Sequence, residues 1–174
     1  KLYLVIGKTY PVFNFYTFLR RHTLALNLIS MEEITSFSKL TNKEHLPNDP
    51  FLLLGDHLKI FLKSFLKQLG VDKTPVIKGE VSPHALIEGA VYIEEGVYVE
   101  PFAYIKGPTY IGRGSEIRHG AYIRGDVYVG AKCVVGHTTE VKGSVFLDGA
   151  KAGHFAYVGD SILGQEVNLG AGTK

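Results

Sequence analysis

Three basic residues in the second half of the chain are separated by a constant interval of 18 residues: Lys106, Arg124 and Lys142. If positions at this interval stack at strand spacing, the cations lie about 5 Å apart. They would then repel by up to about 3 kcal/mol per neighbouring pair at an effective dielectric constant of about 20. A bound anion, or carboxylates from a second chain, would relieve this repulsion. The alternative is three flexible side chains that spread into water, where the repulsion is screened.

Three histidines follow nearly the same interval, at His119, His137 and His154, with a last step of 17 residues. Stacked imidazoles are compatible with a metal site, because histidine is a common zinc ligand. However, ligands at strand spacing must bend toward one another to share an ion, and no series of carboxylates flanks the histidines at the required offset. We therefore expect no metal, and a histidine stack that faces solvent or another subunit.

Further polar residues gather around the last histidine if the chain is coiled at this interval. The residues on neighbouring coils are Glu140, Lys142, His154, Tyr157 and Asn168. Glu140 and Tyr157 fall at equivalent places one coil apart, and Arg124 lies beside Lys142. A histidine with a nearby carboxylate and two flanking cations is suited to general-base chemistry on an anionic substrate.

A six-residue repeat predicts the elements that position these residues. An aliphatic residue stands at every sixth position from Val81 to Leu147, namely at Val81, Ile87, Ile93, Val99, Ile105, Ile111, Ile117, Ile123, Val129, Val135, Val141 and Leu147. A six-residue period fits neither one helical face nor an extended hairpin, but it fits stacked coils with short strands. With three hexapeptides per coil, residues 81–174 predict about five coils at a spacing of about 4.8 Å.

The period changes after Leu147. The next inward positions are predicted at Ala152, Val158, Leu163 and Leu169, so that two of the steps are five residues long. We expect the coil geometry to change there, beside the polar residues that surround His154.

Residues 1–75 lack the repeat and are aromatic-rich and helix-patterned. The predicted elements are a short strand over 2–6 and helices over 12–22, 30–40 and 56–69. Asp56 is expected to cap the last helix and Gly70 to end it. We expect residues 1–75 to dock on the first coil and cover its open edge, since repeat stacks need a capping element. Residues 76–174 are then the β-helix domain.

Composition limits the class of protein and its compartment. The chain has 174 residues, 45% of them hydrophobic, and a net charge of +2, which favours no nucleic-acid partner. A single cysteine, Cys133, excludes an intrachain disulfide and suits a reducing compartment. No apolar run reaches the roughly 18 residues of a membrane span, and no signal peptide is recognisable. We expect a cytoplasmic protein whose native chain continues past Lys174.

The segment KAGHFAYVGDSILGQEVNLGAGT (residues 151–173), preceded by GHTTEVK (residues 136–142), closely resembles one enzyme domain. This is the C-terminal acetyltransferase domain of the bifunctional N-acetylglucosamine-1-phosphate uridyltransferase/glucosamine-1-phosphate acetyltransferase. The similarity extends without a gap to Arg124. Residues 76–123 share only the hexapeptide pattern, and residues 1–70 share nothing with that family. The resemblance implies a left-handed parallel β-helix that assembles as a homotrimer.

The resemblance also implies roles for individual residues. His154 matches the general base, and Glu140 matches the acidic residue that orients it. Arg124 and Lys142 match the cations that bind the sugar phosphate. Tyr157 and Asn168 match residues that contact the sugar, and Ala171 matches a backbone position near the acetyl-CoA thioester. His154 would accept a proton from the sugar amine as it attacks the thioester, and backbone N–H groups would stabilise the oxyanion.

Three departures from the family pattern limit what the resemblance implies. His137 stands where the family usually has Asn. After Gly-Ala-Gly-Thr the family continues through Asn-Tyr-Asp-Gly and further coils that hold most of the coenzyme A site, whereas this chain ends at Lys174. The Gly-x-Gly-Thr-Arg segment of the uridyltransferase half is absent, so that nucleotidyl transfer is not indicated.

Three functions therefore stay open on the sequence. The leading one is an acyltransferase-like protein that binds a sugar phosphate or nucleotide sugar and uses acetyl-CoA, with His154 as base. The second is a non-catalytic trimeric scaffold or nucleotide-sugar-binding protein of the same fold. The third is a metalloenzyme similar to γ-class carbonic anhydrases, with histidines shared across the trimer interface.

Overall fold

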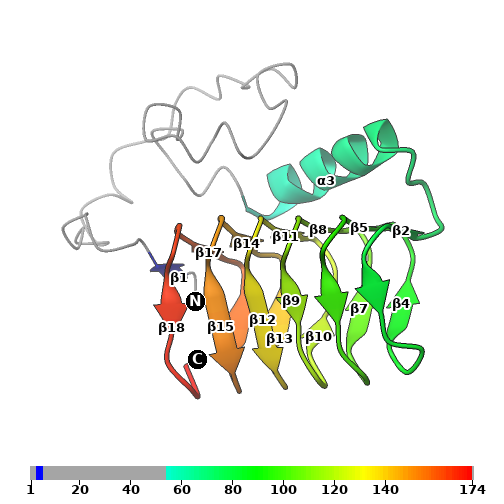
Figure 1. Cartoon of the computed structure of the whole chain (residues 1–174). Helices are drawn as coiled ribbons and strands as arrows, with labels where there is room; N and C mark the ends of the chain where they lie inside the picture. The colour runs from blue at the N-terminus through cyan, green and yellow to red at the C-terminus, as the bar shows by residue number, and fades with distance from the viewer. Residues whose placement is uncertain (1–2, 6–53, 174) are drawn as a thin grey trace, which may run out of the picture.

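The protein is a parallel β-helix with one α-helix packed along its side, as seen in a computed structural model that describes residues 3–5 and 54–173 (Figure 1). The predicted parallel β-helix is confirmed, and its described strands run from Val76 to Leu169. The predicted N-terminal strand is also confirmed, as β1 (Tyr3–Val5). The helices predicted over 12–22 and 30–40 lie outside the described residues.

Each coil contributes one short strand to each of three parallel sheets. Sheet A contains β2 (Val76–Ile77), β5 (Val91–Ile93), β8 (Thr109–Ile111), β11 (Val127–Val129), β14 (Val145–Phe146) and β17 (Ser161–Leu163), with β1 added after β17. Sheet B contains β3 (Glu80–Val81), β6 (Tyr98–Val99), β9 (Glu116–Ile117), β12 (Val134–His137), β15 (Lys151–His154) and β18 (Asn168–Leu169). Sheet C contains β4 (Leu86–Glu88), β7 (Tyr104–Lys106), β10 (Tyr122–Ile123), β13 (Glu140–Lys142) and β16 (Tyr157–Gly159).

The aliphatic residues of the repeat fill the interior of the coils. Ile105, Ile111, Ile117 and Ile123 are completely buried, as the repeat predicts. Burying such a side chain contributes about 1.5–3 kcal/mol. The small residues between them, among them Ala121, are equally buried. One column of hydrophobic contacts therefore continues through the whole stack.

The change in period occurs one step earlier than predicted. Phe146, not Leu147, follows Val141 at the inward position, since Val129 pairs with Phe146 and Phe146 pairs with Leu163. Leu147 packs outside the coil, in the cluster beneath the helix. The predicted inward position of Leu147 is therefore wrong. The two five-residue steps both fall where the chain turns from sheet C to sheet A, and each of these corners is shortened by one residue.

The helix predicted over 56–69 is confirmed as α3 (Asp56–Gln68). It begins after Gly55, so that Asp56 is not the cap; the carboxylate lies in the first turn, where it is favourable to the helix dipole. Gly70, at φ 79, ends the helix, and the N–H of Val71 donates to the carbonyl of Leu66.

The helix lies on the outer face of sheet A (Figure 1). Its buried residues are Leu58, Phe61, Leu62 and Leu66. They pack on a column of stacked rings, in which Tyr92 and Tyr110 are 5.8 Å apart and Tyr110 and Tyr128 are 5.0 Å apart. Residues 1–75 are predicted to dock on the first coil and cover its open edge, and this prediction is wrong for α3, which lies along the side of the stack. The tyrosine column offers a continuous apolar surface along the side of the stack, and α3 contacts β8 and β11 in its middle.

Strand β1 also lies away from the first coil. It pairs in parallel with β17, at the opposite end of sheet A, with Leu4 beside Ile162. The division into residues 1–75 and 76–174 stays a prediction, because the two described parts of the N-terminal region pack directly on the β-helix.

Candidate functional site

The outer face of sheet C carries the cations and the tyrosine predicted for the site. Backbone pairing places Tyr122, Glu140 and Tyr157 side by side on successive coils. Lys142 pairs with Gly159 at the other end of the same strands, and Arg124 follows β10 directly. The stacking of positions 18 or 17 residues apart is therefore confirmed, and it brings four of the predicted site residues onto one face.

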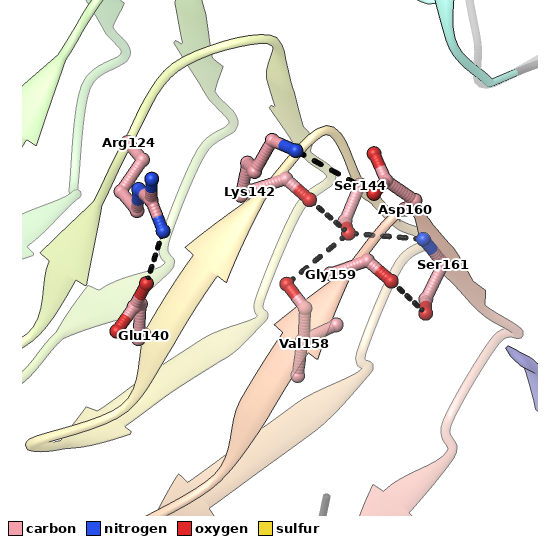
Figure 2. A network of polar contacts seen from close by, with 8 residues as sticks. All are labelled: Arg124, Glu140, Lys142, Ser144, Val158, Gly159, Asp160 and Ser161. Carbon is pink, nitrogen blue, oxygen red and sulfur yellow. Dashed lines mark hydrogen bonds and ion pairs between the residues drawn. The ribbon is translucent and has the colours of Figure 1, made fainter. Parts of the chain in front are cut away.

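Two of the three stacked cations form ion pairs with carboxylates of the same chain (Figure 2). Arg124 Nη1 donates a hydrogen bond of 2.7 Å to Glu140 Oε1, and Lys142 Nζ lies 3.6 Å from Asp160 Oδ2. The hydrogen bond to Glu140 raises the pKa of Arg124. The chain thus offsets part of the repulsion between its own cations. Because all four side chains are partly exposed, an incoming anion can compete for both cations.

The third cation, Lys106, has a different partner. Its Nζ lies 5.0 Å from the centre of the Tyr104 ring, and this tyrosine raises the pKa of Lys106. Tyr104 in turn donates a 2.6 Å hydrogen bond to Glu88 Oε2. Lys106 is therefore held in a separate cluster toward the first coil.

The shortened corner after sheet C is braced by two serines (Figure 2). Ser144 Oγ lies 2.7 Å from the carbonyl oxygen of Lys142 and 3.3 Å from that of Val158, and it accepts a 3.1 Å hydrogen bond from the N–H of Ser161. Ser161 Oγ donates to the carbonyl of Gly159 over 2.7 Å. These bonds hold the two strand ends that carry Lys142 and Asp160.

Tyr157 lies flat along its own strand. A Cβ atom added at Gly159 would be 2.6 Å from Tyr157 Oη, so that the ring crosses directly above this glycine. The side chain is 45% exposed. Because Gly159 pairs with Lys142, the ring extends from the corner of the coil toward the cations.

His154 is exposed at the end of β15, at the corner between sheets B and C, and it pairs with His137. The predicted histidine stack is confirmed for two members, since the rings of His119 and His137 stack at 5.6 Å. In the described structure the next ring against His137 belongs to Phe155, at 5.3 Å, and not to His154.

The pair of Glu140 and His154 is not formed in this structure. Among the described side chains, Glu140 has its hydrogen bond with Arg124 and none with His154. Asn168 pairs with Lys151 on sheet B, across the corner from Tyr157. The predicted residues therefore occupy two faces that meet at His154.

Ala171 lies in the corner that follows β18, directly above that of His154. The N–H of Gly172 donates to the carbonyl of His154 over 3.2 Å, which stacks the two corners. Ala171 thus occupies the position of His154 one coil further on, at the exposed end of the described stack.

Two residues near the site escape sequence reasoning. Asp160, the partner of Lys142, lies in the second shortened corner, between Val158 and Leu163; the repeat predicts this corner but not which side chain its carboxylate meets. Phe155 is 59% exposed although it is aromatic. Its signal in the sequence is an aromatic residue out of phase with the inward positions.

The described residues offer no group of three His, Cys, Asp or Glu side chains that could hold a metal ion. In the same part of the chain, no helix has the length and apolar character needed to cross a membrane.

The fold and the site define a parallel β-helix of hexapeptide coils with an exposed, charged face beside a corner histidine. The family model of the GMPPB C-terminal domain matches residues 105–174. This match covers less than half of the chain and relates the coils from Ile105 onward to a β-helix domain of the sugar nucleotidyltransferase type. No curated protein matches the chain in sequence.

Proposed function

We propose that this protein binds a sugar phosphate on the outer face of sheet C and transfers an acyl group to the sugar, with His154 as general base. The observation that carries the proposal is the backbone pairing that aligns Glu140 with Tyr157 and Lys142 with Gly159. This pairing supports a substrate-binding surface along β16, with Lys142 at one end and His154 at the corner before the other end. The resemblance of residues 136–173 to a glucosamine-1-phosphate acetyltransferase domain supports the same reaction.

The ion pairs give substrate binding a role in assembling the site. A phosphate on Arg124 and Lys142 competes with Glu140 and Asp160 for these cations. Each of the two ion pairs is a single contact, of 2.7 and 3.6 Å, between partly exposed side chains. Once released from Arg124, Glu140 can accept a hydrogen bond from His154 and orient its ring. The base is then aligned only when the anionic substrate is present.

The transfer step uses acetyl-CoA as co-substrate. The neutral sugar amine attacks the thioester carbonyl carbon, and His154 accepts the proton that the amine loses. The C–S bond then breaks, and the thiolate takes the proton back from His154. Backbone N–H groups near Ala171 are suited to stabilise the oxyanion of the tetrahedral intermediate.

A calorimetric titration with glucosamine-1-phosphate tests the phosphate site. Arg124→Ala should weaken binding about tenfold or more, because a charge-assisted hydrogen bond to phosphate contributes about 1.5–3 kcal/mol. Lys106→Ala is the matched control, since Lys106 belongs to the same column but lies outside the site. Equal affinity in the wild type and Arg124→Ala would contradict the proposal, as would a failure of the wild type to bind.

A second candidate is a non-catalytic sugar-phosphate or nucleotide-sugar binding protein of the same fold. The observation that favours it is the bond between Glu140 and Arg124, which leaves His154 without its predicted carboxylate partner. An assay of acetyl transfer with the wild type and His154→Ala separates the two functions. Binding without turnover in either protein would favour the second candidate.

A further inference from the structure

Phe155 combines two unfavourable features at the corner between sheets B and C. Its side chain is 59% exposed, and its backbone is in the left-handed region at φ 49. Bulky residues rarely adopt this conformation, and a phenyl ring in water forgoes the favourable free energy of burial. Residues in sparsely populated conformations cluster at functional sites.

The corner itself does not require phenylalanine. In four other coils the same corner position is occupied by Phe102, Gly120, Thr138 and Gly172, at φ values of 63, 67, 48 and 74. Glycine adopts this conformation without steric cost and stands at two of these positions. The backbone can therefore form the corner with a residue that has no side chain at all.

The ring of Phe155 is exposed but held in place. The ring of His137 meets it in a T-shaped contact at 5.3 Å, and His137 stacks on His119 at 5.6 Å. The ring therefore presents a fixed apolar surface to solvent.

This surface lies at one end of the charged face. Phe155 follows His154 and precedes Tyr157 by two residues, and the strand then continues to Gly159 beside Lys142. The four steps from Phe155 to Gly159 span at most about 13 Å, the length of fully extended strand, because Phe155 lies in the corner before β16. Lys142 and Phe155 therefore lie near the two ends of this segment, with the exposed ring of Tyr157 between them. This segment is long enough to accommodate one hexose ring over Tyr157.

We propose that Phe155 contacts the substrate and determines its specificity: its ring forms the end wall of the sugar subsite and packs against the apolar C–H face of a hexose. This inference rests on the proposed function, because the phosphate of the same substrate occupies Arg124 and Lys142. It accounts for an apolar ring beside a charged face, since a hexose phosphate has both kinds of surface.

The test compares Phe155→Gly with Phe102→Gly as a matched control. Both residues are exposed, share the left-handed backbone and contact histidine rings, but Phe102 lies three coils away, at about 14 Å. Calorimetry with glucosamine-1-phosphate should show an affinity about three- to tenfold lower for Phe155→Gly, in line with one lost aromatic contact. Affinity should be unchanged for Phe102→Gly and restored in Phe155→Tyr.

Two further readouts separate a substrate contact from a structural role. Inorganic phosphate should bind Phe155→Gly and the wild type equally, because the cations are untouched. The thermal unfolding midpoint of Phe155→Gly should stay within about 3 °C of the wild type, since glycine suits this backbone. A large fall in the midpoint, or equal losses of affinity in both glycine variants, would assign the ring to the fold and overturn the inference.

The remaining outcomes distinguish this inference from the proposed function. If the wild type binds the sugar phosphate and Phe155→Gly binds it equally well, the inference fails while the proposed function stands. If Phe155→Gly weakens only acetyl-CoA binding, the ring contacts the acyl donor and the sugar subsite is overturned. If the wild type binds inorganic phosphate but no sugar phosphate, both proposals fail.

Discussion

At the scale of single residues, Glu140 has two candidate partners, Arg124 and His154. Its carboxylate holds Arg124 in the described structure, whereas the resemblance assigns it to His154. Both roles suit a carboxylate, but one hydrogen bond to a cation at a partly exposed position is typically worth less than about 1 kcal/mol. An anionic substrate can therefore shift Glu140 from the first role to the second.

Glu140→Gln tests this exchange, because it should change binding and turnover in opposite directions. Loss of the carboxylate removes the competitor for Arg124, so that glucosamine-1-phosphate should bind equally well or up to about fivefold more tightly. Acetyl transfer should fall by about tenfold or more, since His154 loses the group that orients it. Calorimetry and a thiol-release assay measure the two quantities. A loss of phosphate affinity in this variant would mean that Glu140 supports the cation rather than competing with the substrate.

Cys133 shows how a residue is constrained by its place in the coil. It is completely buried at a small-residue position, with its Sγ 3.2 Å from the carbonyl oxygen of Leu147. Burial raises the pKa of the thiol to about 12. The native state therefore retains the thiol proton at pH values at which the unfolded chain loses it, since the ordinary pKa of a cysteine thiol is about 8.5.

This shift predicts a loss of stability in alkali. The protonated thiol contributes to the free energy of unfolding in full below the pKa of the unfolded chain. This contribution is lost as pH rises toward about 12, because the unfolded state then binds fewer protons than the native state. Denaturation of the wild type and Cys133→Ala between pH 8 and pH 11 should show a steeper decline for the wild type. Parallel curves would contradict the shift. In the native state at pH 8, the thiol should also resist a soluble thiol reagent.

At the scale of elements, α3 and sheet A stabilise one another. The apolar stripe of the helix is matched by the stacked tyrosines, and Phe65 meets the ring of Tyr110 at 5.1 Å. A helix of this length is marginal in isolation, so that its stability comes mainly from this packing.

Leu62→Ala should lower the free energy of unfolding by about 2–5 kcal/mol, because Leu62 is completely buried under the helix. Lys63→Ala, on the exposed side of the same helix, should change it by less than about 0.5 kcal/mol. Urea denaturation measures both. Equal, small effects would show that α3 does not remain docked on sheet A in solution.

At the scale of the whole molecule, the exposed hydrophobic residues are distributed unevenly. Of the large exposed hydrophobic side chains in the described β-helix, only Ile77 lies on sheet A, which α3 covers in part, whereas sheets B and C and the corner between them carry Leu86, Tyr98, Phe102, Phe155 and Tyr157. Concentrated apolar exposure of this kind is typical of an interaction surface. Leu86 and Tyr98, which lie on the first coils away from the candidate site, support the homotrimer that the resemblance implies, with this part of sheets B and C toward neighbouring copies.

Sedimentation should therefore show a trimer for the wild type. Leu86→Glu on sheet C should shift the distribution toward monomer. Ile60→Glu, which changes an equally exposed residue on the outer side of α3, should leave it unchanged. A wild-type monomer at micromolar concentration would contradict the trimer, and equal effects of both substitutions would contradict the assigned faces.

The repeat predicts the coils and the columns of stacked residues, because a strict period in the sequence becomes a vertical column once the chain is wound. It thereby predicts the cation column, the pairing of Glu140 with Tyr157 and the stack of His119 on His137. The position of the first five-residue step was not predictable. Phe146 and Leu147 are both apolar, and only the geometry of the corner decides which of them points inward. Handedness entered through the resemblance, because crossovers between parallel strands are otherwise right-handed.

The sequence by itself determined the β-helix, most of its interior column and the stacking of Arg124, Glu140, Lys142 and Tyr157 on one face, because these follow from local periodicity. Only the tertiary structure decided where α3 and β1 pack, which carboxylate each cation binds, and that Phe155 rather than His154 meets His137. These outcomes depend on competition between side chains that are distant in sequence. A period along the chain carries no information about that competition.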